Sequence, residues 1–240
     1  MFNLQDLSPL QKQLRRRLLE VVFREKLSHL GSCLSALDAM IAIYGIKRPD
    51  DRFVLSNGHA GLGLYVVLEK EGSMSLATMK DLNIHPDRSI AQGIYVSTGS
   101  LGQGLPIALG MALADPDRDI YCMISDGECA EGSIWEALRI SVDQNVRNLK
   151  VIVNVNGWAA YKQVVPQRLK AQFEGFGMKV LEVNGHSVPE LQKAIKECQG
   201  GQSVVFANTD VEQFPFLHGL DAHYYVMNAQ DVNVAMEALR

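Results

Sequence analysis

Two short apolar segments in the middle of the chain, joined by one helical segment, constrain the fold more than any other feature. Residues 120–124 have the pattern of a buried strand that ends just before Asp126, and residues 150–155 repeat that pattern just before Asn156. The amphipathic segment 132–144 between them predicts a helix. A crossover of this kind joins parallel strands and is right-handed. We therefore predict that Asp126 and Asn156 lie at the same edge of a parallel sheet, on adjacent strands.

The same alternation continues along the rest of the chain. Short apolar strand patterns are separated by helical patterns, which is typical of α/β proteins. Further strands are predicted at residues 53–55, 179–183 and 203–208, and further helices at 9–25, 35–44, 61–71, from near 101 to 114, 167–176, 188–199 and from 229 onward. We predict an α/β fold with a mainly parallel sheet and helices on both faces. Because no internal repeat or linker divides the sequence, residues 1–240 are expected to form one domain.

Composition places the chain among ordinary globular proteins. Hydrophobic residues make up 47% and charged residues 21% of its 240 residues, and the net charge is −4. This balance provides no positive field for nucleic acid. No apolar run reaches the roughly 20 residues that span a bilayer, and the N-terminal segment lacks the apolar core of a signal peptide. We therefore expect a cytoplasmic protein with no membrane contact and no nucleic-acid partner.

Three groups of side chains receive structural interpretations. The basic run Arg15, Arg16 and Arg17 is interpreted as a solvated helix face. The four cysteines lack metal-ligand spacing, and Cys122 is interpreted as a small core residue, which fits a reducing compartment. Trp135, on the helix after the first central strand, is interpreted as a packing residue.

The predicted sheet edge brings together ligands for a hard divalent cation. Asp126 offers a carboxylate and Asn156 an amide oxygen, and Mg²⁺ (or Ca²⁺ or Mn²⁺) binds about six such oxygens. Small molecules bind open parallel sheets beyond the carboxyl ends of the strands. Diphosphate oxygens would complete the coordination, and Gly127 would let the backbone approach them closely.

The central unit resembles the N-terminal part of transketolases, which are thiamine diphosphate enzymes. Their motif is Gly-Asp-Gly followed about thirty residues later by Asn, and this chain has Ser125-Asp126-Gly127 and Asn156. Serine replaces the first glycine, so the turn before Asp126 is expected to be less permissive. The resemblance implies the thiamine diphosphate-binding fold, with the cofactor and Mg²⁺ held at Asp126, Asn156 and the backbone carbonyl of Trp158.

Further segments extend the resemblance from about residue 7 to about residue 228. The segment around His29 looks like the family's loop facing the substrate, and the segment ending in His59 is similar to one whose histidine contacts the diphosphate. His85 lies in a loop similar to the family's Gly-His-Pro loop, with Ile84 in place of glycine. The resemblance further implies three cofactor-binding or contact positions: Gly99 and Leu101 beside the aminopyrimidine and diphosphate, and Glu131 at the subunit contact.

The family has one more active-site histidine near the end of this domain, and two residues of this chain match it. His218 keeps the His-Gly dipeptide of single-chain members, whereas His223 lies in register with the end of split chains. We favour His223 and leave His218 open. The resemblance then implies His29, His85 and His223 as catalytic residues, because imidazoles steady developing alkoxides and move protons. His186 is given no catalytic role.

The resemblance also implies a partner. In transketolases the glutamate that activates the aminopyrimidine lies in a pyrimidine-binding domain of a partner subunit, and this sequence has no such domain. We expect a separate C-terminal-type chain, two copies of each chain, and sites at their interface, where the small-residue helix beginning near Leu101 would permit close contact. The implied reaction transfers a two-carbon ketol unit between sugars or sugar phosphates.

Two alternatives remain on the sequence alone. The first keeps the cofactor in a 2-oxoacid decarboxylase or dehydrogenase subunit, or in a carboligase, although the histidine set suits polyhydroxylated substrates better. The second is a catalytically silent scaffold. Ser125, Ile84 and the loop 208–214, which is acidic and aromatic where many split chains are rich in Gly and Lys, favour that reading.

Overall fold

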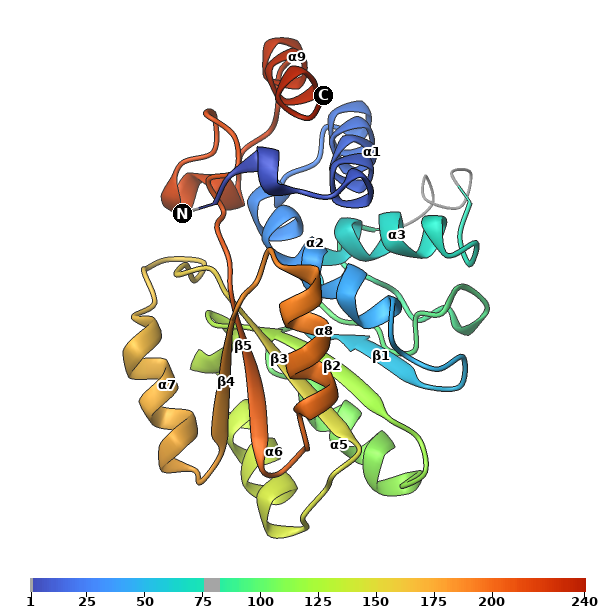
Figure 1. Ribbon diagram of the computed structural model, residues 1–240, viewed down its shortest axis with the longest axis vertical. Coiled ribbons are helices and arrows are strands. Elements are labelled where there is room, and N and C mark those ends of the chain that lie inside the picture. Colours follow the sequence, from blue (N-terminus) through green and yellow to red (C-terminus); the bar gives the residue numbers. More distant parts are fainter. Residues whose placement is uncertain (1, 76–82) are drawn as a thin grey trace.

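The computed structural model describes residues 2–75 and 83–240, and a parallel sheet forms its centre (Figure 1). Its strands are β1 (Arg52–Leu55), β2 (Ile120–Ser125), β3 (Leu149–Val155), β4 (Lys179–Asn184) and β5 (Ser203–Asn208). They lie in the order β1-β2-β3-β5-β4, and all neighbouring pairs are parallel. The predicted α/β architecture with a parallel sheet is therefore confirmed.

Helices cover both faces of this sheet. They are α1 (Pro9–Glu25), α2 (Leu30–Tyr44), α3 (Gly61–Lys70), α5 (Gly104–Ala114), α6 (Gly132–Asp143), α7 (Pro166–Gly175), α8 (Val188–Glu197) and α9 (Ala229–Ala238). One face carries α5, α6 and α7, and the other carries α2 and α8 (Figure 1). Outside α2 lie α1 and α3, and α9 contacts α1. Within the described residues, no helix combines the length and apolar character needed to cross a bilayer.

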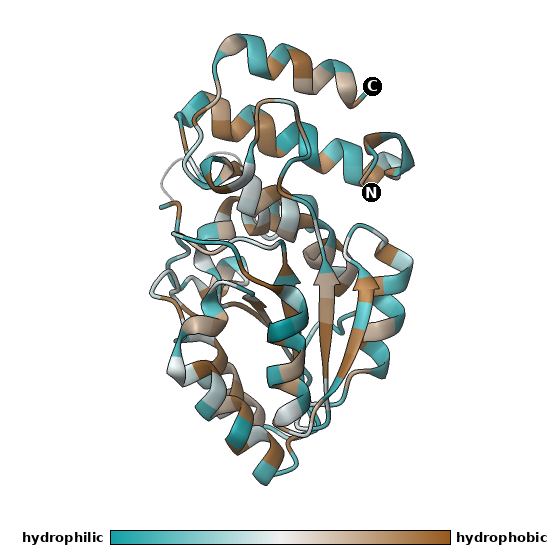
Figure 2. Ribbon diagram, turned by 90° about the vertical axis from the view of Figure 1, so that its left-hand side faces the viewer, coloured by the Kyte–Doolittle hydropathy of each residue, from teal (hydrophilic) through white to brown (hydrophobic). Residues whose placement is uncertain are grey.

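The two apolar layers follow from the alternation of side chains along each strand. Val151 and Val153 of β3 face the layer of α5, α6 and α7, whereas Ile152 faces the layer of α2 and α8. Because both faces are covered, the central strands β2, β3 and β5 are largely apolar, whereas the edge strand β4 contains exposed polar residues. Figure 2 shows hydrophobic colours along the strands. The chain thus buries both faces of its sheet.

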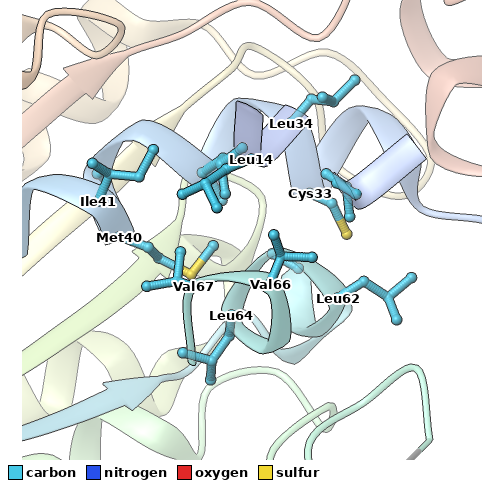
Figure 3. Close-up of a cluster of buried hydrophobic side chains, with 14 of the residues drawn as sticks. Leu14, Cys33, Leu34, Met40, Ile41, Leu62, Leu64, Val66 and Val67 are labelled. Carbon is cyan, nitrogen blue, oxygen red and sulfur yellow. The ribbon is translucent and has the colours of Figure 1, made fainter. Parts of the chain in front are cut away.

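The outer helical layer has its own apolar contacts. Leu14 of α1, Leu34 and Met40 of α2, and Leu64 and Val67 of α3 belong to one buried cluster (Figure 3). The predicted start of α1 is confirmed: the Ser8 hydroxyl accepts a hydrogen bond from the amide of Gln11, and the Gln11 side chain accepts one from the amide of Ser8.

The interpretation of the basic run as a solvated face is wrong. Arg15 is fully buried, and its guanidinium forms two hydrogen bonds with the Asp38 carboxylate, at 2.6 and 2.8 Å. Its Nε donates to the side chain of Gln213. Arg17 is half-buried and pairs with Glu69 at 2.6 Å. Because Arg15 pairs with the buried Asp38 of α2, this part of α1 faces the protein interior.

Two predicted helix boundaries are also wrong. The second helix begins at Leu30, not at 35, because His29 has a left-handed backbone (φ 69°) and the helix starts directly after it. The helix predicted to begin near Leu101 begins at Gly104. Gly99 and Gly102 have φ values of 135° and 84°, which a right-handed helix cannot contain.

Two packing interpretations are confirmed. The Trp135 ring lies 5.0 Å from the Phe173 ring and 5.2 Å from the Phe176 ring, measured between centroids, and its Nε1–H donates to the Cys129 carbonyl. Cys122 is fully buried in the sheet. Both side chains therefore belong to the core.

Candidate active site

The carboxyl ends of β2 and β3 bring Asp126 and Asn156 together, as the crossover predicted. The two strands are parallel neighbours, with Ser125 paired to Asn154 at their ends. The amide of Asp126 donates to the Asn154 carbonyl at 3.1 Å, and the amide of Gly157 donates to Asp126 Oδ2 at 2.7 Å. The two turns are thus bonded to each other.

Asp126 is a buried carboxylate without a positive partner. It is 2% exposed, and among the described residues it forms no ion pair with a lysine or arginine. Its hydrogen bonds come from the amides of Gly157 and Gly127, at 2.7 and 2.8 Å. Burial raises the pKa of this carboxyl to about 7, although these amides act in the opposite direction. A bound cation would compensate for the missing charge.

The neighbouring oxygens fit such a cation. Asn156 Oδ1 accepts a hydrogen bond from the amide of Trp158 at 3.0 Å and keeps a second lone pair. The Trp158 carbonyl oxygen lies 3.3 Å from the position that a Cβ atom on Gly127 would occupy, and that Cβ would be only 2.8 Å from the Cα of Ala159. A carboxylate, an amide oxygen and a carbonyl oxygen are ligands that Mg²⁺ prefers. A side chain at position 127 would collide with Ala159, so glycine is required there.

A cleft of about 140 Å³ opens beside this edge. Most residues expected from the sequence line it: His29, His59, His85, Gly99, Leu101, Gly127, Asn156, Trp158 and His223. Asp126 is almost fully buried and is not among the lining residues. Glu131 is exposed and outside the cleft, next to Gly102. The structure thus brings together nearly the whole expected set, except for Glu131.

Four histidines from distant parts of the chain meet in the cleft. The His29 ring lies 4.4 Å from His223, 5.8 Å from His85 and 6.3 Å from His59, measured between centroids. His29 precedes α2, His59 follows β1, and His223 ends a 3-10 helix at Gly219–His223. The amide of His29 donates to the carbonyl of His223 at 2.9 Å, so these two segments are fixed to each other.

Gly99 makes room for the fourth histidine. Its φ of 135° is a conformation that glycine adopts readily, and a Cβ atom there would lie 2.8 Å from the His85 ring. The exposed His85 side chain therefore packs directly against the backbone of the loop 97–104. Ile84, the departure from the family's glycine, does not keep His85 out of the cleft.

Burial and mutual proximity lower the pKa values of His29, His59 and His223. Burial, reinforced by His223 and His85, lowers the pKa of His29 to about 4. Burial, followed by the three other histidines, lowers the pKa of His59 to about 3, and burial with His85 lowers the pKa of His223. Within the described ranges these groups form no metal-binding cluster. Neutral imidazoles can each donate one hydrogen bond and accept another.

The two candidates for the late histidine are separated by position. His223 lines the cleft, and its Nδ1 lies 3.2 Å from the Ser32 hydroxyl. His218 is exposed and is not among the residues that line the cleft. The geometry therefore supports the choice of His223 as the candidate residue. His186 bonds to Asp38 and Asp210 instead, outside the cleft.

Sequence reasoning missed Glu128, which also lines the cleft and is fully buried. Its carboxylate accepts hydrogen bonds from the Ser56 hydroxyl at 2.6 Å, the Gly102 amide at 2.8 Å and the Ser125 amide at 3.4 Å. Burial raises its pKa despite these donors. Glu128 thus ties together three loops of the cleft. Its place directly after Asp126-Gly127 is the signal that would have identified it.

Ser125 has a structural role that the sequence did not suggest. It is the last residue of β2, and its φ is not positive, so this position does not require the conformational freedom of glycine. Its hydroxyl accepts a hydrogen bond from the amide of Glu128 at 3.2 Å. The serine therefore adopts its backbone conformation without strain and adds a hydrogen bond through its hydroxyl.

Comparisons with known proteins agree with this geometry. A family model described as "Transketolase, thiamine diphosphate binding domain" matches residues 29–206. The chain is 33% identical over 207 residues to a subunit of the apulose-4-phosphate transketolase of Phocaeicola vulgatus, covering 76% of this chain and 73% of that protein. It is 32% identical over 232 residues to the 6-deoxy-6-sulfo-D-fructose transketolase subunit SqwG of Clostridium sp. (strain MSTE9), covering 85% and 84%.

Longer relatives match over part of their length. Human transketolase is 34% identical over 236 residues, which are 86% of this chain and 37% of that protein. A crystal structure of a transketolase mutant from Pichia stipitis superposes with a TM-score of 0.87 at 22% identity, over 97% of this chain and 41% of the other. The transketolase structure from Campylobacter jejuni gives a TM-score of 0.80 at 25% identity, over 96% and 42%.

These matches confirm the predicted fold, the predicted thiamine diphosphate-binding character and the assignment to a ketol-transferring subunit, and they do not favour the 2-oxoacid alternative. By its sequence, its sheet topology and the residues gathered at the carboxyl edge of that sheet, this chain belongs to the transketolase family, of which it carries the thiamine diphosphate-binding domain.

Proposed function

We propose that this chain holds the diphosphate of thiamine diphosphate through Mg²⁺ and transfers a two-carbon ketol unit together with a separate pyrimidine-domain chain. One observation carries the proposal: a buried carboxylate without a counterion among the described residues, Asp126, lies at the edge of a cleft that contains four histidines. The carboxylate suits a cation, and the imidazoles suit the hydroxyl groups of a sugar.

Each group in the cleft has a distinct task in this proposal. Asp126, Asn156 and the Trp158 carbonyl hold the cation, and His59 contacts the diphosphate. When bound, the cofactor supplies the electron sink for breaking and forming the carbon–carbon bond. His29, His85 and His223 bind the hydroxyl groups of the ketose and aldose, donate hydrogen bonds to the alkoxide as it develops, and move its proton. An imidazole can donate a proton or accept one, so these side chains can serve the forward and the reverse proton transfer.

Two observations support a separate partner chain. The cleft of about 140 Å³ is smaller than the roughly 300–1,000 Å³ of pockets that enclose small molecules, so a second surface is needed to close it. Ile107 and Leu113 of α5 are 42% and 47% exposed although both are large apolar side chains. We propose that this face of α5 contacts the partner, in an assembly with two copies of each chain. Two relatives are named as subunits, which agrees with this arrangement.

The side chains that line the cleft restrict how the sugar can be recognised. The names of two relatives specify a phosphorylated and a sulfonated sugar. Among the described residues that line the cleft, none is lysine or arginine. If the substrate carries an anionic group, the described residues of the cleft offer it no basic side chain. We propose that the partner chain supplies one. We propose a ketose donor and an aldose acceptor, phosphorylated or not.

The test is reconstitution of this chain with a separate pyrimidine-domain chain, thiamine diphosphate and Mg²⁺. Ketol transfer is followed by product analysis across a panel of ketoses and aldoses, with and without phosphate. Pyruvate serves as the substrate for the 2-oxoacid alternative, and the same complex carrying Asp126→Asn is the matched control. We expect sugar transfer only with both chains present. Turnover of pyruvate without sugar transfer, or no cofactor binding at all, would contradict the proposal.

A further inference from the structure

A single serine of α2 connects Asn154, in β3, with Asn156, which directly follows that strand. Asn154 lies two positions after Ile152 and therefore on the same face of the sheet. That face is covered by α2, and the fully buried Ser35 of α2 meets both side chains. Asn154 Nδ2 donates to Ser35 Oγ at 2.9 Å, and Asn156 Nδ2 donates to it at 3.3 Å.

The hydroxyl of Ser35 has no hydrogen-bonding capacity left. It donates its own hydrogen to the Ser32 carbonyl at 3.1 Å and accepts two hydrogen bonds, which is the full capacity of a hydroxyl group. Asn154 is fixed independently, because its Oδ1 accepts a hydrogen bond from the Thr209 hydroxyl at 2.7 Å. The lone pair that Ser35 offers to Asn156 can therefore take only an N–H donor.

This arrangement decides which end of the Asn156 amide faces the cation site. With Nδ2 directed to Ser35, Oδ1 points the other way, where it also accepts from the Trp158 amide. A reversed amide would bring Oδ1 against a Ser35 hydroxyl whose hydrogen is already used. It would also direct an NH₂ group, which cannot bind a cation, toward the Trp158 amide, where two donors would face each other.

We propose that Ser35 is a positioning residue of the metal site, which holds the Asn156 amide with its oxygen toward the cation. This inference rests on the proposed function, since it requires Mg²⁺ and thiamine diphosphate to bind at Asp126 and Asn156. It adds a residue that makes no contact with the cation and acts only through the orientation of a ligand. Residues that orient metal ligands typically change metal affinity about 10–100-fold when replaced.

The experiment measures Mg²⁺ binding by calorimetry in the two-chain complex with saturating thiamine diphosphate. Ser35→Ala should weaken Mg²⁺ binding about 10–100-fold. Ser35→Cys, which keeps the side-chain volume but is a weaker acceptor, should give a smaller loss and covers the case in which the alanine variant does not fold. The matched control is Ser141→Ala, because Ser141 is equally buried and its hydroxyl has no hydrogen-bond partner in the described structure. It should bind Mg²⁺ like the wild type.

A double mutant separates orientation from packing. Asn156→Asp presents two oxygens whichever way it turns, so Ser35→Ala in that background should cost at most about twofold. Equal losses in both backgrounds would show that Ser35 acts through packing or Asn154, and would overturn the inference. The inference also fails if Ser35→Ala and Ser35→Cys bind Mg²⁺ as tightly as the wild type. A wild-type complex that binds no Mg²⁺ would instead overturn the proposed function, and this inference with it.

Discussion

Two buried aspartates of this chain have opposite electrostatic surroundings. Asp38 is fully buried on α2 and contacts two basic groups, the Arg15 guanidinium at 2.6 Å and His186 Nδ1 at 2.8 Å. Burial by itself would raise the pKa of Asp38, but the charge and hydrogen bonds of Arg15, followed by those of His186, hold it at about 2. Asp126 is buried to the same degree but has only backbone amides as partners, and burial raises its pKa to about 7.

The difference separates a carboxylate that belongs to the fold from one that binds a cation in the proposed function. The charge of Asp38 is neutralised within the chain, where it joins α1, α2 and the loop of His186. The charge of Asp126 is compensated by no basic side chain among the described residues. A buried charge is tolerated only when it is paired, binds a metal or takes up a proton. In this pair, burial alone does not distinguish the proposed metal ligand from the structural residue, whereas the lack of a counterion does.

The largest expected effect concerns Asp38. Asp38→Asn leaves the Arg15 guanidinium buried without its counterion, which typically costs about 3–5 kcal/mol of unfolding free energy. The loss is measured by urea unfolding of the isolated subunit. Replacing both partners, as Asp38→Leu with Arg15→Met, should recover most of it, because no charge is then left unpaired. If Asp38→Asn is as stable as the wild type, the ion pair is not part of the fold and the comparison fails.

Asp126→Asn should have the opposite profile. We expect Mg²⁺-dependent binding of thiamine diphosphate to weaken by more than the roughly 10–100-fold typical of residues outside the ligand shell. Without Mg²⁺ the subunit should be as stable as the wild type or more stable, because an unpaired buried charge is removed. Calorimetry gives the first quantity and thermal unfolding the second. A variant that is strongly destabilised yet binds the cofactor normally would reverse the roles of the two aspartates.

The surroundings of Asp126 can be predicted from the sequence far better than those of Asp38. The position of Asp126 follows from local patterns, because a strand–helix–strand crossover determines which strand ends are neighbours. The partner of Arg15 does not follow from its own segment. A run of three arginines on an amphipathic helix is usually solvated, and only the packing of α2 against α1 places Asp38 beneath it.

The candidate site shows the same limit. The histidines and the sheet-edge residues were identified because each lies in a motif, whereas Ser35 and Glu128 were missed. Both act through contacts between segments far apart in the chain: Ser35 meets Asn156 after β3, and Glu128 meets Ser56 after β1. Residue type and spacing do not specify these contacts, although the place of Glu128 directly after Asp126-Gly127 was a signal for that residue. They become visible only when the sheet order and the helix packing are known.

The histidines beside Asp126 should make the stability of the subunit depend on pH. The pKa of His59 in the folded subunit, about 3, lies below its value of about 6.5 in an unfolded chain. As the pH falls below about 6.5, the unfolded state takes up a proton that the folded state does not, so stability decreases toward pH 3. Between pH 6.5 and pH 5 this loss is at most roughly 2 kcal/mol. In thermal unfolding of the subunit without Mg²⁺, His59→Gln should lose less stability than the wild type over this range. Equal slopes would mean that His59 is protonated in the folded protein.

The smallest effect is expected at Ser125, next to Asp126, where the chain departs from the family's glycine. Ser125→Gly removes the hydrogen bond from the Glu128 amide and adds flexibility to the unfolded chain, which should cost about 1 kcal/mol of stability. Because Ser125 lies at the end of β2 without a positive φ, the glycine gains no conformation that the site needs. Mg²⁺ and thiamine diphosphate should therefore bind the variant within about twofold of the wild type, a change of less than about 0.5 kcal/mol by the usual relation. Ser125→Ala separates the two causes, since it loses the hydroxyl but not the backbone restriction. A large gain in cofactor affinity on introducing glycine would mean that the serine distorts the turn at Asp126, and that the raised pKa of this carboxyl reflects a compromised site rather than a place kept for a cation.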